Sequence, residues 1–268
     1  MKKRSKKTIV RPPTQAILEA GHHLYDAVGR FVKMVPQLQD VRRYESNSES
    51  ITLGWVLCRH VEAICELAKN DLVLLPAAHV VARAALETAG RILWMLKPSE
   101  VMERESRWLT HLSGEAGYYE RLAKFMESQG ESRPELVAQA SQVREFYRGV
   151  TSQLPAGIIP QQEAPKFRNL LKDIGKEEAW AFYIELSQYA HAGSAASLLY
   201  RKHLGTAKQI GEHVEPEMWA LPLGIAWFCI IHAGMEITTK LGGQPDMFAC
   251  PVFLKRGNDL IKQLSPSA

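Results

Sequence analysis

The sequence predicts an all-α fold: a multi-helix bundle of about eight helices, with no sheet expected. Three observations support this. Apolar residues recur at three- and four-residue spacing over most of the chain. Capping residues and helix breakers stand at the ends of these segments. No stretch shows the period-two alternation of β-branched residues that is typical of a strand.

Five helices are expected in the first half of the chain. Thr14, directly after Pro12-Pro13, is a candidate N-cap for the first of them. Pro76 suits the first turn of the third, and Ser132-x-x-Glu135 is a capping box that opens the fifth. The fourth is expected to be capped by Ser99. The predicted ranges are about 14–35, 50–69, 76–96, 99–129 and 132–149.

The second half begins with a loop over residues 151–165, which contains three prolines and a glycine. Helices are then expected over about 165–174, 176–203 and 215–243, with a break at Gly193-Ser194 in the second of these. Residues 258–264 are expected to add a last turn or two. The predicted organisation is a disordered basic arm (1–13), a single helical domain (14–243) and a partly ordered C-terminal tail (244–268).

The net charge of +4 is a property of the N-terminal arm. Six lysines and arginines and no acid lie in the first eleven residues, so the remainder carries a formal charge of −2. No apolar segment follows the arm, which argues against a secretory signal. The arm is interpreted as solvated chain, with non-specific contact to nucleic acid as the alternative.

Membrane insertion and disulfide bonding are not expected. The run from Met218 to Met235 has no Asp, Glu, Lys or Arg, but it is at the lower limit of spanning length and contains Pro222, so a buried core helix is the preferred interpretation. The four cysteines form no C-x-x-C pair, which indicates reduced thiols and a cytoplasmic protein.

The third predicted helix carries the first candidate site, in which His79, Arg83 and Glu87 follow one another at four-residue spacing. These residues share one stripe of the helix, inside an otherwise apolar run. An Arg83–Glu87 pair on the helix surface is one interpretation. A buried polar cluster that faces another helix is the preferred one, because ionisable groups on an apolar helix are costly to bury without partners.

A second set of candidates has the same spacing: Tyr183, Ser187 and His191, followed by the small residues Ala192 to Ser197. The Ser–His pair lacks the strand-elbow context of a serine hydrolase, so a histidine in a polar seam is the expected role. The expected geometry places His191 against Arg83 and Glu87 across a helix interface.

The fourth helix carries Arg104-x6-His111, nearly two turns apart and so on one face. An Arg can hold a phosphate while a His moves a proton, which is what metal-independent RNA cleavage requires.

No metal and no cofactor are expected. Glu19-x-x-His22 with Asp26 resembles half of a carboxylate-bridged metal site, but no second Glu-x-x-His exists. Gly-rich phosphate-binding loops are also absent from the sequence.

Two segments, Val81–Glu87 with the Trp94 turn and Leu186–His191, resemble a group of bacterial helical proteins known only as a domain of unknown function. The resemblance covers about residues 50–199. Such proteins resemble the HEPN-like superfamily of prokaryotic and eukaryotic nucleotide-binding helical domains, many of them toxin or antiphage RNases. The resemblance implies a homodimer with an Arg…His pair at a cleft, and Arg104…His111 is the match here.

Two functional hypotheses follow. In the first, the chain is a metal-independent ribonuclease, or an inactive relative, in bacterial defence or toxin–antitoxin biology. Its catalytic candidates are Arg83, Glu87, His191, Arg104 and His111, and RNA is its partner. In the second, the chain is a non-enzymatic helical module that binds a small ligand or a partner protein through a buried polar cluster, with His79, Tyr183 and Ser187 as ligand-binding candidates. The near-neutral body fits the second hypothesis better, because nucleic-acid binders usually have a basic face.

Overall fold

The computed structural model describes residues 10–161, 163–201 and 211–265, and every regular element within them is helical. These ranges contain eleven α-helices, which confirms the predicted all-α fold class. The excess over the expected eight comes from two short helices, α8 and α10, and from α11, all in the C-terminal part of the chain.

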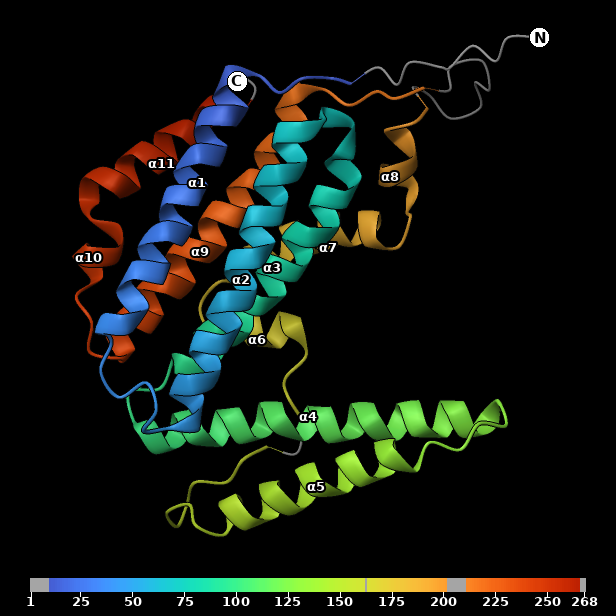
Figure 1. The fold of residues 1–268 in the computed structure, drawn as a ribbon, viewed down its shortest axis with the longest axis vertical. Coiled ribbons are helices and arrows are strands. Elements are labelled where there is room, and N and C mark those ends of the chain that lie inside the picture. The colour runs from blue at the N-terminus through green and yellow to red at the C-terminus, as the bar shows by residue number, and fades with distance from the viewer. Residues whose placement is uncertain (1–9, 162, 202–210, 266–268) are drawn as a thin grey trace.

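The core is built around α2 (Glu45–Asn70), α3 (Leu75–Leu96) and α9 (Ala220–Lys240), which pack against one another (Figure 1). Helix α1 (Gln15–Met34) covers α2 and α9, and α10 (Pro245–Ala249) and α11 (Pro251–Leu264) lie along α1. Three short 3-10 segments connect or extend these helices: Val35–Gln37, Leu72–Leu74 and Pro216–Trp219.

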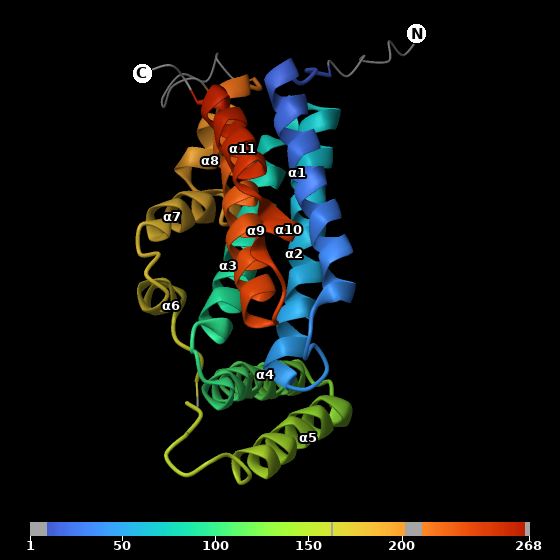
Figure 2. The ribbon, with the colours of Figure 1, turned by 90° about the vertical axis from the view of Figure 1, so that its left-hand side faces the viewer.

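Helix α4 (Val101–Ser128) lies across one end of the bundle, and α5 (Pro134–Thr151) folds back along it (Figures 1 and 2). The buried carboxylate of Glu105 joins α4 to α2. It accepts the backbone N–H of Ser46 at 2.8 Å and that of Glu45 at 3.3 Å. An anion at a helix N-terminus accepts hydrogen bonds from N–H groups that have no partner inside the helix, and it is stabilised by the helix dipole.

Three shorter helices, α6 (Phe167–Asp173), α7 (Ala179–Ala190) and α8 (Ser194–Leu198), run along the side of α3 away from α1 (Figure 2). Asp173 at the end of α6 forms ion pairs with Lys97 at 3.1 Å and Arg107 at 3.0 Å. These contacts tie α6 to the corner between α3 and α4.

The predicted N-cap at Thr14 is confirmed, because its hydroxyl oxygen accepts the N–H of Ile17. The predicted arm is shorter at its inner end than expected. Arg11 falls within the predicted disordered arm, yet its side chain donates to the backbone oxygens of Val214 and Glu212 at 2.7 Å, and its N–H donates to Asp71. Residues 1–9 lie outside the described part of the chain.

Several predicted helix boundaries were wrong. Helix α2 begins at Glu45, five residues before the expected start, because Glu105 of α4 supplies the cap that the local sequence lacks. The residue before α4 is Glu100 rather than Ser99. The capping box at Ser132 and Glu135 does not form, since α5 starts at Pro134 with no side-chain cap.

The C-terminal tail is more ordered than expected. Helix α11 runs from Pro251, although only residues 258–264 were expected to be helical. Its apolar stripe explains the difference: Phe253, Leu260 and Leu264 are buried in the main core, as is Phe248 of α10. The break expected at Gly193-Ser194 is confirmed, because α7 ends at Ala190 and α8 begins at Ser194. The last residues of the expected helix over 176–203 lie outside the described range.

Two segments, Leu72–Leu96 and Pro216–Lys240, are long and apolar enough to cross a membrane by length and composition. In this fold they contain α3 and α9, which pack on each other and on α2. The composition of each is therefore accounted for by a place at the centre of a helical bundle.

Candidate functional site

Four polar side chains follow one another along α3 at four-residue spacing: His79, Arg83, Glu87 and Arg91. The first is buried, the next two are half-buried and the last is exposed, so the stripe rises from the core to the surface. The buried His79 and the more exposed side chains therefore have different contacts.

Arg83 is the hub of the predicted cluster. Its Nη2 donates to the Tyr183 hydroxyl at 2.8 Å, and its Nη1 lies 3.2 Å from Nε2 of His191. Nε is 3.2 Å from the Glu87 carboxylate but is not directed at it, so that contact is an ion pair without a hydrogen bond. Because an arginine can only donate, Nε2 of His191 must be the unprotonated, accepting nitrogen.

The structure therefore brings Arg83, Glu87, Tyr183 and His191 together, as the sequence predicted. The cluster is not sealed in the core, however. His191 is exposed, and the Arg83 and Glu87 side chains are 21% and 30% exposed. The expectation of a buried cluster was wrong, because α7 covers only one side of α3 at this level.

Two predicted members take no part in the cluster. Ser187 donates its hydroxyl to the Tyr183 carbonyl one turn back at 2.6 Å, a contact within its own helix. His79 stacks on Tyr189 with ring centroids 3.9 Å apart, and its Nδ1 is 2.9 Å from the Leu75 carbonyl. Burial lowers the pKa of His79 to about 4, so this ring is a neutral part of the core.

A cleft of about 750 Å³ opens beside the cluster, between α2, α3, α4 and the chain around α6 and α7. Glu87 and Tyr183 line it, which makes the Arg83 cluster one wall of the cleft. His111 of α4 lines it as well. Five other aromatic side chains line the cleft: Trp94, Tyr118, Tyr119, Phe167 and Tyr183.

The cleft is acidic. Three of the side chains that line it are acidic (Glu49, Glu87 and Glu115) and one is basic (Arg91), which gives the lining a formal charge of −2 with His111 neutral. Arg83, which pairs with Glu87 behind this wall, reduces the charge to −1. Burial, and then the neighbouring carboxylates of Glu115 and Glu45, raise the pKa of Glu49. Burial and the nearby Arg91 lower the pKa of His111. The histidine is therefore uncharged at neutral pH, and its Nε2 stands 4.0 Å from Glu49.

The predicted Arg104…His111 pair is not assembled as a site. His111 lines the cleft, whereas Arg104 does not line it and is only 8% exposed. Arg104 instead lies near Glu236 of α9. Burial raises the pKa of Glu236, and the positive charges of Lys240 and Arg104 oppose this rise. Seven residues separate the two side chains by roughly 10 Å along the helix axis, so they can meet different neighbouring helices although they share a face.

Sequence reasoning missed several residues of the cleft. Arg91 continues the spacing of His79, Arg83 and Glu87, and Glu115 is one turn after His111, so helical periodicity could have found both. Glu49 gave no such signal, because its place in the cleft depends on how α2 packs against α4.

Within the described ranges, no group of three or more His, Cys, Asp or Glu side chains is arranged to hold a metal ion. Half of the metal motif considered from the sequence, Glu19-x-x-His22, lies on α1, where His22 is exposed. The four cysteines are all free thiols.

Fold and site together define a helical-bundle protein with an acidic, aromatic-lined cleft beside a central arginine. The chain belongs to a family of unknown function, DUF5677, whose model matches residues 54–209. The matched segment includes α3, α4 and α7 and so carries most of the cleft, and the membership agrees with the resemblance noted at Val81–Glu87 and Leu186–His191. No curated protein and no solved structure matches the chain.

Proposed function

We propose that this chain is a ligand-binding helical module whose site is the cleft between α2, α3, α4 and α7, and that the ligand is a small organic cation with an aromatic or planar part. The observation that carries the proposal is the lining of the cleft: three carboxylates against one guanidinium, among five aromatic rings.

Carboxylates and aromatic faces together favour a cation. An ammonium or amidinium group gains Coulomb attraction from the carboxylates and quadrupole attraction from the ring faces. A volume of about 750 Å³ is typical of sites for small molecules. A phosphate would meet net negative charge here, so the same lining disfavours RNA.

The Arg83 cluster shapes one wall of this site. Arg83 holds the Tyr183 hydroxyl and lies over its ring at 4.8 Å, while Trp180 stacks on the same ring at 4.9 Å. Tyr183 is thereby fixed in orientation. Arg83 and His191 act as positioning residues, and Glu87 and Tyr183 are the members that face the ligand.

Calorimetric titration with benzamidine and tyramine tests the proposal, with benzoate and benzamide as anionic and neutral probes of similar shape. Glu115 is exposed and forms no ion pair among the described residues, so Glu115→Gln should leave the fold intact. We expect this variant to raise the Kd of the cations about five- to tenfold, because one charge-assisted contact is lost.

Glu127→Gln is the matched control. It removes the same charge from an exposed position of the same helix outside the cleft, and its Kd should stay within about twofold of the parent value, as for other exposed charges. Equal binding of benzoate and benzamidine, or an equal loss in the two variants, would refute the proposal.

A second function, metal-independent RNA cleavage in bacterial defence, is favoured by one contact, that between Arg83 and the exposed His191. An arginine and a histidine within 3.2 Å at the surface have the chemistry to hold a phosphate and transfer a proton. In this second proposal Arg104 has no role, because its side chain is buried.

Incubation of the protein with RNA in EDTA tests this second proposal. Cleavage that is lost in His191→Ala and retained in His111→Ala would support catalysis at the Arg83–His191 pair. Cleavage retained in His191→Ala, or no cleavage by the parent protein, would exclude it.

A further inference from the structure

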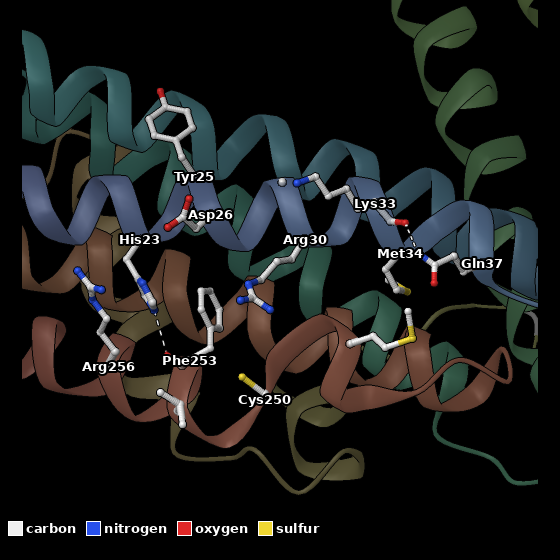
Figure 3. A pocket seen from close by; sticks show the side chains of 13 residues that line it. His23, Tyr25, Asp26, Arg30, Lys33, Met34, Gln37, Cys250, Phe253 and Arg256 are labelled. Atoms are coloured by element: carbon white, nitrogen blue, oxygen red, sulfur yellow. Dashed lines mark hydrogen bonds between the residues drawn. The ribbon is translucent and has the colours of Figure 1, made fainter.

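A second cleft, of about 650 Å³, lies between α1 and the segment that forms α10 and α11 (Figure 3). It shares no lining residue with the acidic cleft and lies outside residues 54–209. Figure 1 shows α1, α10 and α11 on one side of the bundle and α6 and α7 on the other.

This cleft has the opposite charge. Arg30 and Lys33 of α1 and Arg256 of α11 line it, with Asp26 as its one carboxylate, which gives a formal charge of +2 with His23 neutral. Burial is the main cause of the lowered pKa of His23, and Arg256 and Arg30 lower it further. The sequence spacing reflects the arrangement: residues 23, 26, 30 and 33 form one stripe of α1.

The three cations are not neutralised by the protein. None of them forms an ion pair with a carboxylate in the described ranges, whereas Arg83 and Arg107 elsewhere are paired with Glu87 and Asp173. Three cations that line one cleft without an ion-pair partner leave a positive potential there, which favours an anionic ligand.

Figure 3 shows how the groups lie, with the His23 and Phe253 side chains between Arg30 and Arg256 and with Lys33 extended along α1. Arg30 extends from α1 toward α11, and Arg256 extends from α11 toward α1. The Arg30 guanidinium lies 4.3 Å from the centre of the Phe253 ring, which holds it in place, and Nε2 of His23 is 3.1 Å from the Phe253 carbonyl. Apolar side chains complete the cleft: Met34, Met247 and Val252.

We propose that this cleft binds a small phosphate monoester, with its phosphate among Arg30, Lys33 and Arg256 and its organic part against the methionines and Val252. A phosphate monoester carries close to two negative charges at neutral pH, which matches the charge of the lining. Each planar guanidinium group can donate two hydrogen bonds to a pair of phosphate oxygens. Such groups therefore bind a phosphate dianion more strongly than a monoanion.

Phenyl phosphate is the calorimetric probe, with phenyl sulfate as the monoanion of the same shape. We expect phenyl phosphate to bind more tightly than phenyl sulfate, with a Kd that rises with salt. Lys33→Gln and Arg256→Gln change exposed side chains, so both should fold, and each should raise the Kd about tenfold. Lys255→Gln, one residue along α11 and outside the cleft, should change it less than about twofold.

Gly29 permits a variant that leaves every charge in place. It lines the cleft, and a Cβ added there meets no atom within 4 Å. Gly29→Met should therefore fold, place its side chain in the cleft and abolish binding. Gly149→Met, at an equally open helical position in α5, is the steric control and should bind like the parent.

The same phosphate chemistry occurs in the headgroup of phosphatidic acid, so a vesicle arm distinguishes the source. Binding of phenyl phosphate without sedimentation on vesicles of phosphatidic acid and phosphatidylcholine assigns the cleft to a soluble ester. Sedimentation that Gly29→Met abolishes assigns it to the lipid headgroup. If neither probe binds, or if Lys255→Gln loses as much as Arg256→Gln, the proposal is wrong. Neither result bears on the cation cleft, which none of these variants touches.

Discussion

At the scale of single residues, one spacing produces side chains with unlike roles. His79, Arg83 and Glu87 share a stripe of α3, yet His79 is 2% exposed and stacked in the core, while Arg83 and Glu87 reach solvent. The difference follows from what covers α3 at each level. Tyr189 covers His79, whereas Tyr183 covers only one side of Arg83.

His79 should make stability depend on pH. Its pKa is about 4 in the folded protein and 6.5 when unfolded, so between these values the unfolded chain binds a proton that the folded chain does not. The free energy of unfolding is then fully retained above pH 6.5 and falls as the pH drops toward 4. We expect a loss of about 2 kcal/mol between pH 7.5 and pH 5, measured by urea unfolding.

The variant His79→Phe isolates this effect, because phenylalanine can stack on Tyr189 but carries no titrating group. His23 and Glu49 also have shifted pKa values, so the comparison is of pH dependence with and without His79. If the two proteins lose equal stability on acidification, another group is responsible.

Some side-chain contacts could be predicted from the sequence and others could not. The meeting of Arg83 with His191 was predicted, because each is on a strongly periodic helix and their chemistry makes isolation costly. The pairing of Arg104 with His111 was wrong, because a shared helix face does not decide which neighbouring helix each side chain meets. Glu49 could not be found, since only the packing of α2 on α4 brings it to the cleft.

At the scale of elements, helix ends are where local rules and tertiary structure disagree. Thr14 caps α1 as its own sequence predicts. Helix α2 is capped instead by Glu105, a residue sixty positions along the chain from Glu45, and so it starts earlier than any local signal indicates. The spacing of residues within a segment cannot predict a cap that is supplied by a distant part of the chain.

Glu105→Ala should destabilise the protein by about 2–3 kcal/mol, because it leaves the buried N–H of Ser46 and the part-buried N–H of Glu45 at the start of α2 without a charged acceptor. Chemical denaturation of the variant measures the loss. Glu103→Ala, an exposed position on the same turn of α4, should cost less than about 0.5 kcal/mol. A loss no greater than that of the control would show that α2 does not depend on this carboxylate.

At the scale of the whole molecule, the two clefts have opposite charge on opposite sides of one core. The fold class and the central helices could be predicted, because long apolar segments must bury their faces together. The clefts could not, because each is formed by helices distant in sequence: α1 with α11, and α2 with α4. The formal charge of −2 outside the first eleven residues does not reveal that positive and negative side chains line different clefts.

The α4–α5 hairpin should be the least stable part of the described bundle. Among the residues of α5 only Ala140 is buried, and α4 has no buried residue after Ala116, whereas α9 is buried along most of its length. Few buried apolar contacts predict a low free energy of local opening. Hydrogen exchange followed by mass spectrometry should show α5 amides exchanging at least about tenfold faster than those of α9.

The same measurement tests the homodimer expected from the sequence. Tyr118, Phe125 and Phe146 are large exposed apolar side chains on the hairpin, and a second copy of the chain that packed on them would slow exchange there. Protection of α5 that increases with protein concentration would indicate self-association through this surface. Protection of α5 equal to that of α9 at every dilution would contradict the predicted local opening, because the hairpin would then open only with the whole core.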